Sequence, residues 1–528
     1  MTREDQVEQC FEQLSCNDRQ QQPQKPLHIV LVDIKKTEKS GKIHCVEKSL
    51  EDDLKYVALS YRWGELQETL VDTGVGYIAS ITSFDIKDFI QLCKLISLES
   101  DLKHMDYVWV DAICVNQTNH AQRKATIYQM SNIYEKANYI LAVPDLNLQH
   151  LKDTNTKNNN VIEGSSKYYD YIYHLIHGNT EQLTALDENF FKHWNITPST
   201  RKWLINHTNF FTPGFMKQRQ HSIGYSSEEA LDHIYQVSQA SSEITTKTMT
   251  TDERKLLQEP FTLGPGGMIQ SCDIPEPPEG FHCEGTYCQL HLSEFAIDRQ
   301  PIVPEPQWNH AILERNTAIQ QSMELFCNLI VDWSSRVWVI SEYSIAKKKN
   351  NLKYWFVQLA PEIEESLFEQ PIHFYFCGFD FNQDDNDDPL LSGYTDPLND
   401  LYPPLSDPVY PKFHATMIKH LKERSFLEMI LKSKASRCED RLYAVLPLSK
   451  YKDQPTNQSL VDEEGRCQVV NNLTSLKLKL FQWMDTKDRL DLLFLAGNNA
   501  SLHHDCILPT FATTTIPCDR YPVQYLEF

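Results

Sequence analysis

Apolar strand-like runs alternate with one-faced helical runs in the N-terminal part of the chain, and this alternation limits the possible folds more than any other feature. Strands are expected at 56–61, 107–113 and 138–143, which are rich in valine, isoleucine, leucine and aromatic residues. Helices are expected at 85–99 and 119–137, where apolar residues recur three or four positions apart. Strands that alternate with helices form a parallel sheet with helices on both of its faces.

Polar residues follow the apolar part of 107–113, and their position predicts a binding site. In open α/β sheets, ligands bind beyond the carboxyl ends of the strands. Asp111, Asn116 and Gln117 stand where such a site would be built. Asp111 could instead cap the following loop through backbone N–H groups, and the sequence favours this cap. Cys114 lies among apolar residues without a neighbouring histidine or cation, which favours a buried thiol over a nucleophile.

A second polar group ends the neighbouring strand 56–61 and is expected to line the same crevice. It consists of Ser60, Tyr61, Trp63 and Gly64. Trp63 could equally pack against the end of the sheet. Gly64 is better explained by a turn that needs a glycine.

Composition excludes several classes of function. Among 528 residues, 50 are basic and 72 acidic, so the net charge of −22 repels nucleic-acid phosphates, and no nucleic-acid partner is expected. Residues 1–20 lack the apolar core of a signal peptide, and no run of about 20 apolar residues could span a bilayer. The 14 cysteines are scattered as in proteins that keep their thiols reduced. A cytoplasmic location is therefore expected.

The chain is expected to hold three regions. A glutamine-rich lead-in covers 1–26, an α/β domain covers 27–359, and an α-rich region covers 360–528. Within the α/β domain, asparagine-, proline- and glycine-rich pieces from about 146 to 325 predict a large insertion. The remaining expected elements are strands at 27–34, 354–359 and 372–379 and helices at 336–347 and around 411–433.

Two stretches contain metal-ligand residue types, yet neither has the spacing of a metal site. The loop 380–388 begins like an EF-hand, but Asp385 stands where glycine is required and Leu391 where the closing glutamate is required. The stretch 282–291 supplies His282, Cys283, Cys288 and His291, whose inner spacing matches no common zinc finger. No metal and no cofactor are expected.

Three ordered stretches resemble successive blocks of the fungal heterokaryon-incompatibility (HET) domain. They are YVALSYRWG at 56–64, WVDAICVNQ at 109–117, followed by Arg123, Met130, Ile133 and Tyr134, and RVWVISE at 336–342. DRLYAVLPL at 440–448 is similar to a segment that often follows this domain. The chain departs from the family at Gln122, Thr126 and Ser341, where the family usually has glutamate, glutamine and glutamine.

HET domains are in turn considered similar to Toll/interleukin-1-receptor (TIR) domains. The expected order of strands and helices is that of a TIR domain, with the insertion before the third helix. The resemblance therefore implies a TIR-like, flavodoxin-like sheet. It also implies a protein of self/non-self recognition or defence that triggers cell death and self-associates when activated, with a protein partner that the sequence does not identify.

The resemblance implies two alternative activities. In enzymatic TIR domains, the third helix carries a tryptophan and then a glutamate that acts on the ribose of NAD, and SRVWVISE at 335–342 looks like that helix. Glu342 would then be the catalytic residue of an NAD glycohydrolase, with Arg336 and Trp338 beside the substrate. The alternative is a non-enzymatic assembly module, in which Trp338 is buried and Arg336 and Glu342 form a structural interaction.

Overall fold

The computed structural model describes residues 28–51, 53–64, 66–216, 307–359, 376–383, 408–438, 440–452 and 473–497. They form two compact units. Unit 1 holds the described residues up to 147, with 345–354 and 376–378, and unit 2 holds the rest. The expected lead-in, the stretch 282–291, part of the expected insertion and most of the acidic loop lie outside the described residues.

Unit 1 is built on a mixed sheet in the order β2-β1-β6-β3-β7-β8-β9. Its strands are β1 (His28–Asp33), β2 (Cys45–Ser49), β3 (Tyr56–Tyr61), β6 (Tyr107–Trp109), β7 (Tyr139–Val143), β8 (Leu352–Tyr354) and β9 (Cys377–Phe379). β3 is parallel to β6 and to β7, and β7 is parallel to β8. β1 is antiparallel to both β2 and β6. The expected parallel sheet is confirmed at its centre and carries an antiparallel edge.

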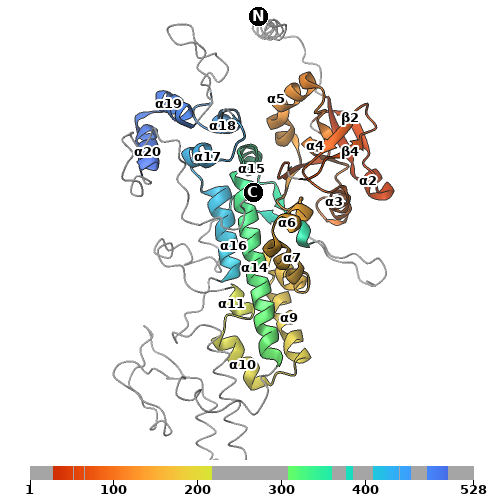
Figure 1. Ribbon diagram of the computed structural model, residues 1–528, viewed down its shortest axis with the longest axis vertical. Helices are drawn as coiled ribbons and strands as arrows, with labels where there is room; N and C mark the ends of the chain where they lie inside the picture. The colour runs from red at the N-terminus through yellow and green to blue at the C-terminus, as the bar shows by residue number, and fades with distance from the viewer. Residues whose placement is uncertain are drawn as a thin grey trace, which may run out of the picture. The chain divides into compact units, whose positions relative to one another are not determined.

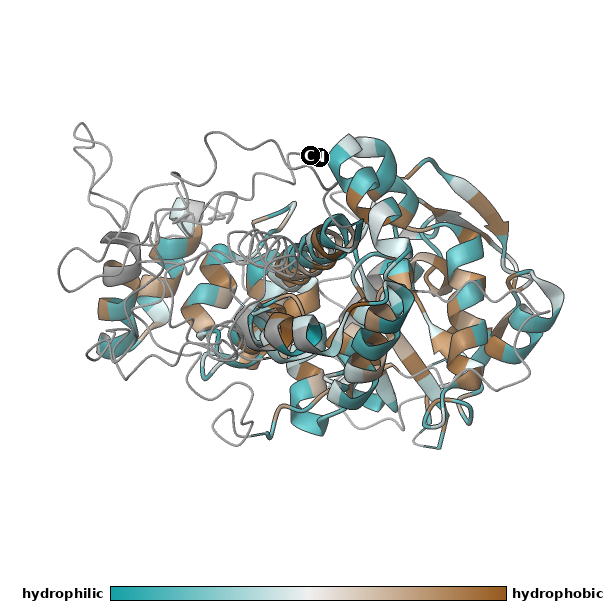
Figure 2. Ribbon diagram, turned by 90° about the horizontal axis from the view of Figure 1, so that it is seen from below, coloured by the Kyte–Doolittle hydropathy of each residue, from teal (hydrophilic) through white to brown (hydrophobic). Residues whose placement is uncertain are grey.

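The central strand and the two long helices of unit 1 begin and end close to where the sequence predicts. β3 is buried at every residue, as expected for a strand covered on both faces. α3 (Ile86–Leu98) begins where the Asp85 side chain accepts the Lys87 N–H, and it buries an apolar face. α5 (His120–Lys136) packs by β3, since the Tyr134 hydroxyl donates to the Leu59 carbonyl at 3.0 Å. Figure 2 shows helices that are hydrophobic on one side and hydrophilic on the other.

Two predicted strands are shorter than expected because the chain turns back on itself. The strand predicted at 107–113 ends at Trp109, and α4 (Asp111–Cys114) follows, because the Cys114 N–H donates to the Val110 carbonyl at 2.7 Å. The strand predicted at 354–359 lies instead at β8, and a 3₁₀ turn, η1 (Val357–Leu359), follows it. Both apolar runs are buried, but burial alone does not distinguish a strand from a turn.

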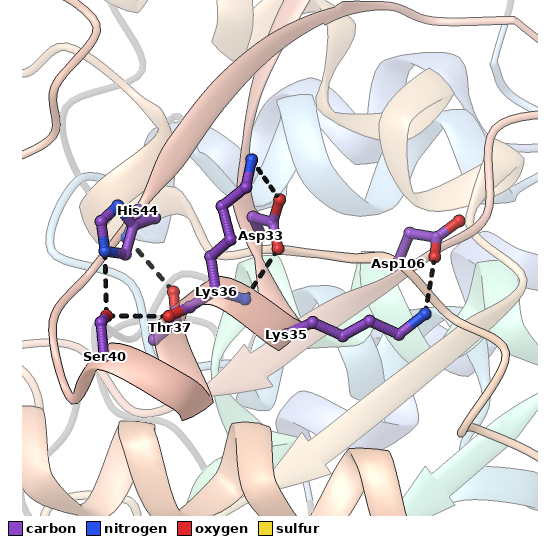
Figure 3. Close-up of polar contacts among 7 residues, drawn as sticks. All are labelled: Asp33, Lys35, Lys36, Thr37, Ser40, His44 and Asp106. Atoms are coloured by element: carbon purple, nitrogen blue, oxygen red, sulfur yellow. Dashed lines mark hydrogen bonds and ion pairs between the residues drawn. The ribbon is translucent and has the colours of Figure 1, made fainter.

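Five of the described elements of unit 1 were not predicted from the sequence: β2, β4, β5, α2 and α4. The hairpin β4 (Thr69–Asp72) and β5 (Ile78–Ile81) forms a separate two-stranded sheet. α2 (Ile34–Ser40) follows β1 directly, with the Asp33 carboxylate accepting the Lys36 N–H at 3.0 Å (Figure 3). At its end, the Ser40 hydroxyl lies 2.9 Å from His44 Nε2.

Unit 2 is mainly helical among its described residues. Residues 148–216, inside the expected insertion, form α6 (Leu148–Thr154), α7 (Thr156–Ser166), α8 (Tyr169–Ile176), α9 (Thr180–His193), α10 (Pro198–His207) and α11 (Thr212–Met216). The long α14 (Gln307–Ser335) packs against α7 and α16 (Val409–Met417) (Figure 1). The unit also contains η3 (Ile418–Lys422), α17 (Phe426–Lys432), α18 (Asp440–Val445), η4 (Leu446–Leu448), α19 (Leu473–Trp483) and α20 (Thr486–Gly497). The helix predicted around 411–433 and the α-rich C-terminal region are confirmed.

α15 (Val337–Lys349) follows α14 and confirms the helix predicted at 336–347. Its first residues belong to unit 2 and its last to unit 1. Lys349 at its end donates to the carbonyls of Glu135 and Ala137, at the end of α5. None of the described helices is long and apolar enough to cross a membrane.

A buried ion pair holds the helices of unit 2 together. Arg315 of α14 is fully buried and lies 3.6 Å from the Asp187 carboxylate on α9. The Arg315 guanidinium also donates to the Tyr171 hydroxyl at 3.1 Å and lies over aromatic rings. Asp187 in turn accepts from the Thr212 N–H and hydroxyl, at 2.8 and 2.6 Å. One arginine thus connects α8, α9 and α14, and Asp187 connects α9 to α11.

Replacing Arg315 should destabilise unit 2, because the Arg315→Met variant leaves the buried Asp187 charge uncompensated. We expect a loss of about 3–5 kcal/mol of unfolding free energy in urea titrations of the full chain. The matched control is Lys167→Met, which removes an exposed ion pair with Glu314, a residue of α14 like Arg315. This control should lower the unfolding free energy by less than about 1 kcal/mol. Equal losses in the two variants would contradict a structural role for the buried pair.

Candidate functional site

A carboxylate held by two aromatic side chains lies beyond the carboxyl ends of two central strands. The Tyr61 hydroxyl donates to Asp111 Oδ1 at 2.5 Å, and the Trp63 indole N–H donates to Asp111 Oδ2 at 2.6 Å. The Ala112 backbone N–H also donates to Oδ1, at 2.9 Å. Tyr61, Trp63 and Asp111, predicted separately from two strands, therefore form one site, which we call the Asp111 site.

The sheet topology brings these residues together. β3 and β6 are parallel neighbours, and Ala58 pairs with Trp109. Both strands therefore end at the same edge of the sheet, with Tyr61 at the end of β3 and Asp111 two residues beyond β6. The turn into α4 presents the Asp111 side chain to the end of β3.

Burial separates the residues that a ligand could reach from those that support them. Ser60 and Tyr61 are buried, and the Tyr61 ring packs edge-on against Phe84 with centroids 5.3 Å apart. Trp63 keeps 39% of its surface exposed, and Asp111 is partly exposed. A ligand would therefore contact Trp63 and Asp111, while the buried Tyr61 hydroxyl holds the Asp111 carboxylate in place through its hydrogen bond.

Opposing effects act on the pKa of Asp111, and burial is the largest. Removal from water disfavours the carboxylate and raises the pKa of Asp111 above its ordinary value of 3.8. The hydrogen bonds from Tyr61, Trp63 and Ala112 favour the charged form and oppose this rise. The result is a carboxyl group whose proton is held more firmly than that of an exposed aspartate.

Gly64 supports the turn that carries Trp63. Its φ of 67° lies in the left-handed region that favours glycine, and its N–H donates to the Ser83 hydroxyl at 2.9 Å. A side chain there would meet no other atom, so backbone conformation explains the glycine. This agrees with the turn role that the sequence favours.

The loop between α4 and α5 contains the other predicted polar residues. Asn116 Oδ1 accepts from the Thr118 hydroxyl at 2.7 Å and from the N–H groups of Thr118 and Asn119, both at 3.2 Å, so this side chain organises the loop. Gln117 beside it is partly exposed. Cys114 is buried, and burial raises the pKa of its thiol far above its ordinary range. The sequence argument for a buried thiol is thus supported.

The residues predicted from the third helix lie in unit 2 and not in the unit that holds the Asp111 site. Trp338 and Glu342 are one turn apart on α15, and Glu342 is 7% exposed. Arg336 immediately precedes α15 and forms an isolated parallel bridge with Lys434. The Val337 N–H donates to the Lys434 carbonyl at 3.0 Å, so this junction is tied to the segment after α17.

No cluster of three or more histidine, cysteine, aspartate or glutamate side chains suited to a metal ion occurs in the parts of the chain that the structure describes. The sequence candidate at 282–291 lies outside those parts. The acidic loop is described only to residue 383, where the Asp380 carboxylate accepts the Asn382 N–H at 2.9 Å.

Comparison with protein families identifies residues 56–206 as a match to the heterokaryon incompatibility protein (HET) family, which confirms the predicted resemblance. The match includes β3, the Asp111 site and the first helices of unit 2. The stretches 336–342 and 440–448 lie beyond it. No curated protein and no solved structure matched the chain.

The fluorescence of Trp63 should report the protonation of Asp111, because the indole N–H bonds directly to the carboxylate. The difference in fluorescence between wild type and Trp63→Phe isolates the signal of Trp63. This signal should change with pH with a midpoint above 3.8, since burial raises the Asp111 pKa. Because the raised pKa belongs to the folded state, the stability that this group contributes is lost as pH rises through that midpoint. Asp111→Asn should abolish the titration. A midpoint at or below 3.8 would contradict the burial argument.

Proposed function

We propose that this protein is a HET-domain effector of fungal self/non-self recognition or defence, whose activation triggers cell death. The observation that carries the proposal is the Asp111 site inside the segment that matches the HET family. A site at the carboxyl ends of parallel strands is the usual ligand position in α/β sheets.

The strand order supports a TIR-like origin of the sheet. Numbered along the chain, the parallel strands β3, β6, β7 and β8 stand in the order 2-1-3-4. Flavodoxin-like sheets begin with the same order. The antiparallel β1 and β2 extend this arrangement at one edge.

The enzymatic form of the proposal is cleavage of NAD between nicotinamide and ribose. Nicotinamide would leave with the bonding electron pair, and water would add to the oxocarbenium-like ribose and release a proton. A carboxylate can stabilise that positive charge. We assign this role to Glu342, supported by the resemblance of residues 335–342 to the third helix of enzymatic TIR domains. Arg336 and Trp338 would assist in binding.

The alternative is an assembly module without enzymatic activity, which acts through self-association or an unidentified protein partner. Exposed apolar side chains on the hairpin β4–β5 favour it. Leu70 is 64% exposed and Ile78 is 56% exposed. Covering such apolar side chains with a partner removes them from water and lowers the free energy of the complex.

Expression of the full chain in a fungal host should arrest growth and lower cellular NAD. Glu342→Gln preserves the shape of the side chain but removes its charge, so NAD consumption should fall by orders of magnitude and growth should recover. Glu324→Gln, an exposed position on α14, is the matched control and should behave as wild type. Protein levels are compared by immunoblot.

The outcomes separate the two forms of the proposal. Growth arrest with an intact NAD pool would favour the assembly module. Full NAD consumption by Glu342→Gln would exclude this residue as the catalyst. Normal growth of the wild-type strain, even when the protein is forced to oligomerise, would contradict the effector function itself.

A further inference from the structure

We propose that the outer edge of the hairpin β4–β5 binds an extended peptide segment of another protein, in which an apolar residue stands between two basic residues at alternate positions. The segment would add to β4 as a further strand. This inference rests on the assembly-module form of the proposed function, for which it names the chemistry of the partner.

β4 has one edge that no described strand covers. β5 pairs with β4 on one side and packs against α4, whereas no described strand pairs with the other side of β4. β2 contacts the hairpin one residue past the end of β4, where the Cys45 N–H donates to the Thr73 carbonyl at 3.3 Å. The open edge of a strand is a template for a further strand, and extended peptides bind to such edges.

The register of the hairpin shows which backbone groups face this edge. Hydrogen-bonded and non-hydrogen-bonded pairs alternate along an antiparallel ladder. The Thr73 N–H donates to the Tyr77 carbonyl at 3.3 Å, so Val71, two residues earlier, also bonds to β5. The N–H and C=O groups of Leu70 and Asp72 therefore point away from β5, toward the open edge.

The exposed face of β4 presents an apolar side chain between two acidic ones. Leu70 is 64% exposed, and Glu68 and Asp72, two residues before and after it, are exposed as well. The hydroxyl of Ser80, which pairs with Leu70, donates to Glu68 Oε1 at 2.5 Å, so Glu68 lies on this same face. Ile78 of β5, 56% exposed, extends its apolar part.

Charge determines which strand fits this edge. Residues 64–86 contain no lysine, arginine or histidine. Opposed side chains on neighbouring strands attract when their charges are opposite and repel when they are alike. A strand with basic residues opposite Glu68 and Asp72 and an apolar residue opposite Leu70 therefore fits, in either direction. Antiparallel pairing with β4 of a second copy, with the two Leu70 residues opposed, would set Glu68 against Asp72 and is disfavoured.

Calorimetric titration of the full chain with two end-blocked heptapeptides tests this pattern. Thr-Lys-Thr-Val-Thr-Lys-Thr presents both lysines and the valine on one face of a strand. Thr-Thr-Lys-Val-Lys-Thr-Thr has the same composition and charge, but its lysines lie on the other face. The first peptide should bind about tenfold or more tightly, because it alone sets a lysine opposite each acidic residue. Equal affinities, or no binding of either peptide, would overturn the proposal.

Two charge variants locate the bound peptide. Glu68→Lys sets like charges against each other and should remove most of the preference for the first peptide. The matched control is Glu47→Lys, an exposed position on the edge strand β2, and it should bind as wild type. Loss of binding in the control, with Glu68→Lys unaffected, would place the peptide on β2 and overturn the proposal.

Two substitutions at Leu70 separate the backbone contact from the side-chain contact. Both Leu70→Ala and Leu70→Pro remove the apolar side chain, but proline also removes the N–H that faces the open edge, where edge strands tolerate it. Leu70→Pro should bind the first peptide about fivefold or more weakly than Leu70→Ala. Equal binding by the two folded variants would overturn the strand pairing. Circular dichroism checks folding, and if Leu70→Pro does not fold, the Glu68→Lys result decides.

Sedimentation of the peptide-free chain distinguishes a peptide partner from a second copy. Leu70→Pro should sediment as wild type, whereas self-association that this variant abolishes would assign the edge to a second copy and overturn the proposal. The effector function is tested separately by growth arrest. Selective peptide binding by a chain that arrests no growth would contradict the effector function alone. Growth arrest by a chain that binds neither peptide would contradict this inference alone.

Discussion

The structure of unit 1 depends on one constraint, the complete burial of β3 between two neighbouring strands. All six residues of β3 are buried, and the strand pairs with β6 on one edge and β7 on the other. A strand in this position has no place for an exposed polar side chain along its length. Polar chemistry must therefore collect where the strand ends, and there Tyr61 reaches the carboxylate that follows β6. The candidate site therefore lies at the end of β3 because this strand is buried along its whole length.

Periodicity predicted the elements whose apolar pattern is unambiguous, and local hydrogen bonds decided the rest. β3, α3 and α5 lie where predicted because burial and capping agree with the pattern. The prediction of a strand at 107–113 was wrong beyond Trp109, because the N–H groups of α4 bond to carbonyls three or four residues earlier in the chain. A run of apolar residues does not indicate such local hydrogen bonds. The helices between 148 and 216 were missed for a similar reason. Asparagine suggests loops, yet Asn155 and Asn179 accept the N–H groups that begin α7 and α9.

The candidate site was predictable in its location and not in its internal arrangement. The rule that parallel strands end at one edge of the sheet placed Trp63 and Asp111 together from the sequence alone. Capping through backbone N–H groups was favoured for Asp111, and the Ala112 N–H does donate to its carboxylate, but the Tyr61 hydroxyl and the Trp63 indole, which the sequence did not indicate as donors, bond to it as well. Nor did the sequence indicate that Tyr61 is buried and Trp63 exposed, because strand-end residues of the same type can face either way. Unit 2 depends likewise on a buried arginine, Arg315, that no motif marks.

The central claim is that the end of β3 and the turn after β6 form one site around the Asp111 carboxylate, and a crystal structure of the full chain tests it most directly. The account predicts the Tyr61 hydroxyl and the Trp63 indole N–H within hydrogen-bond distance of the two Asp111 oxygens. An Asp111 side chain that turns away from both aromatic groups would contradict it.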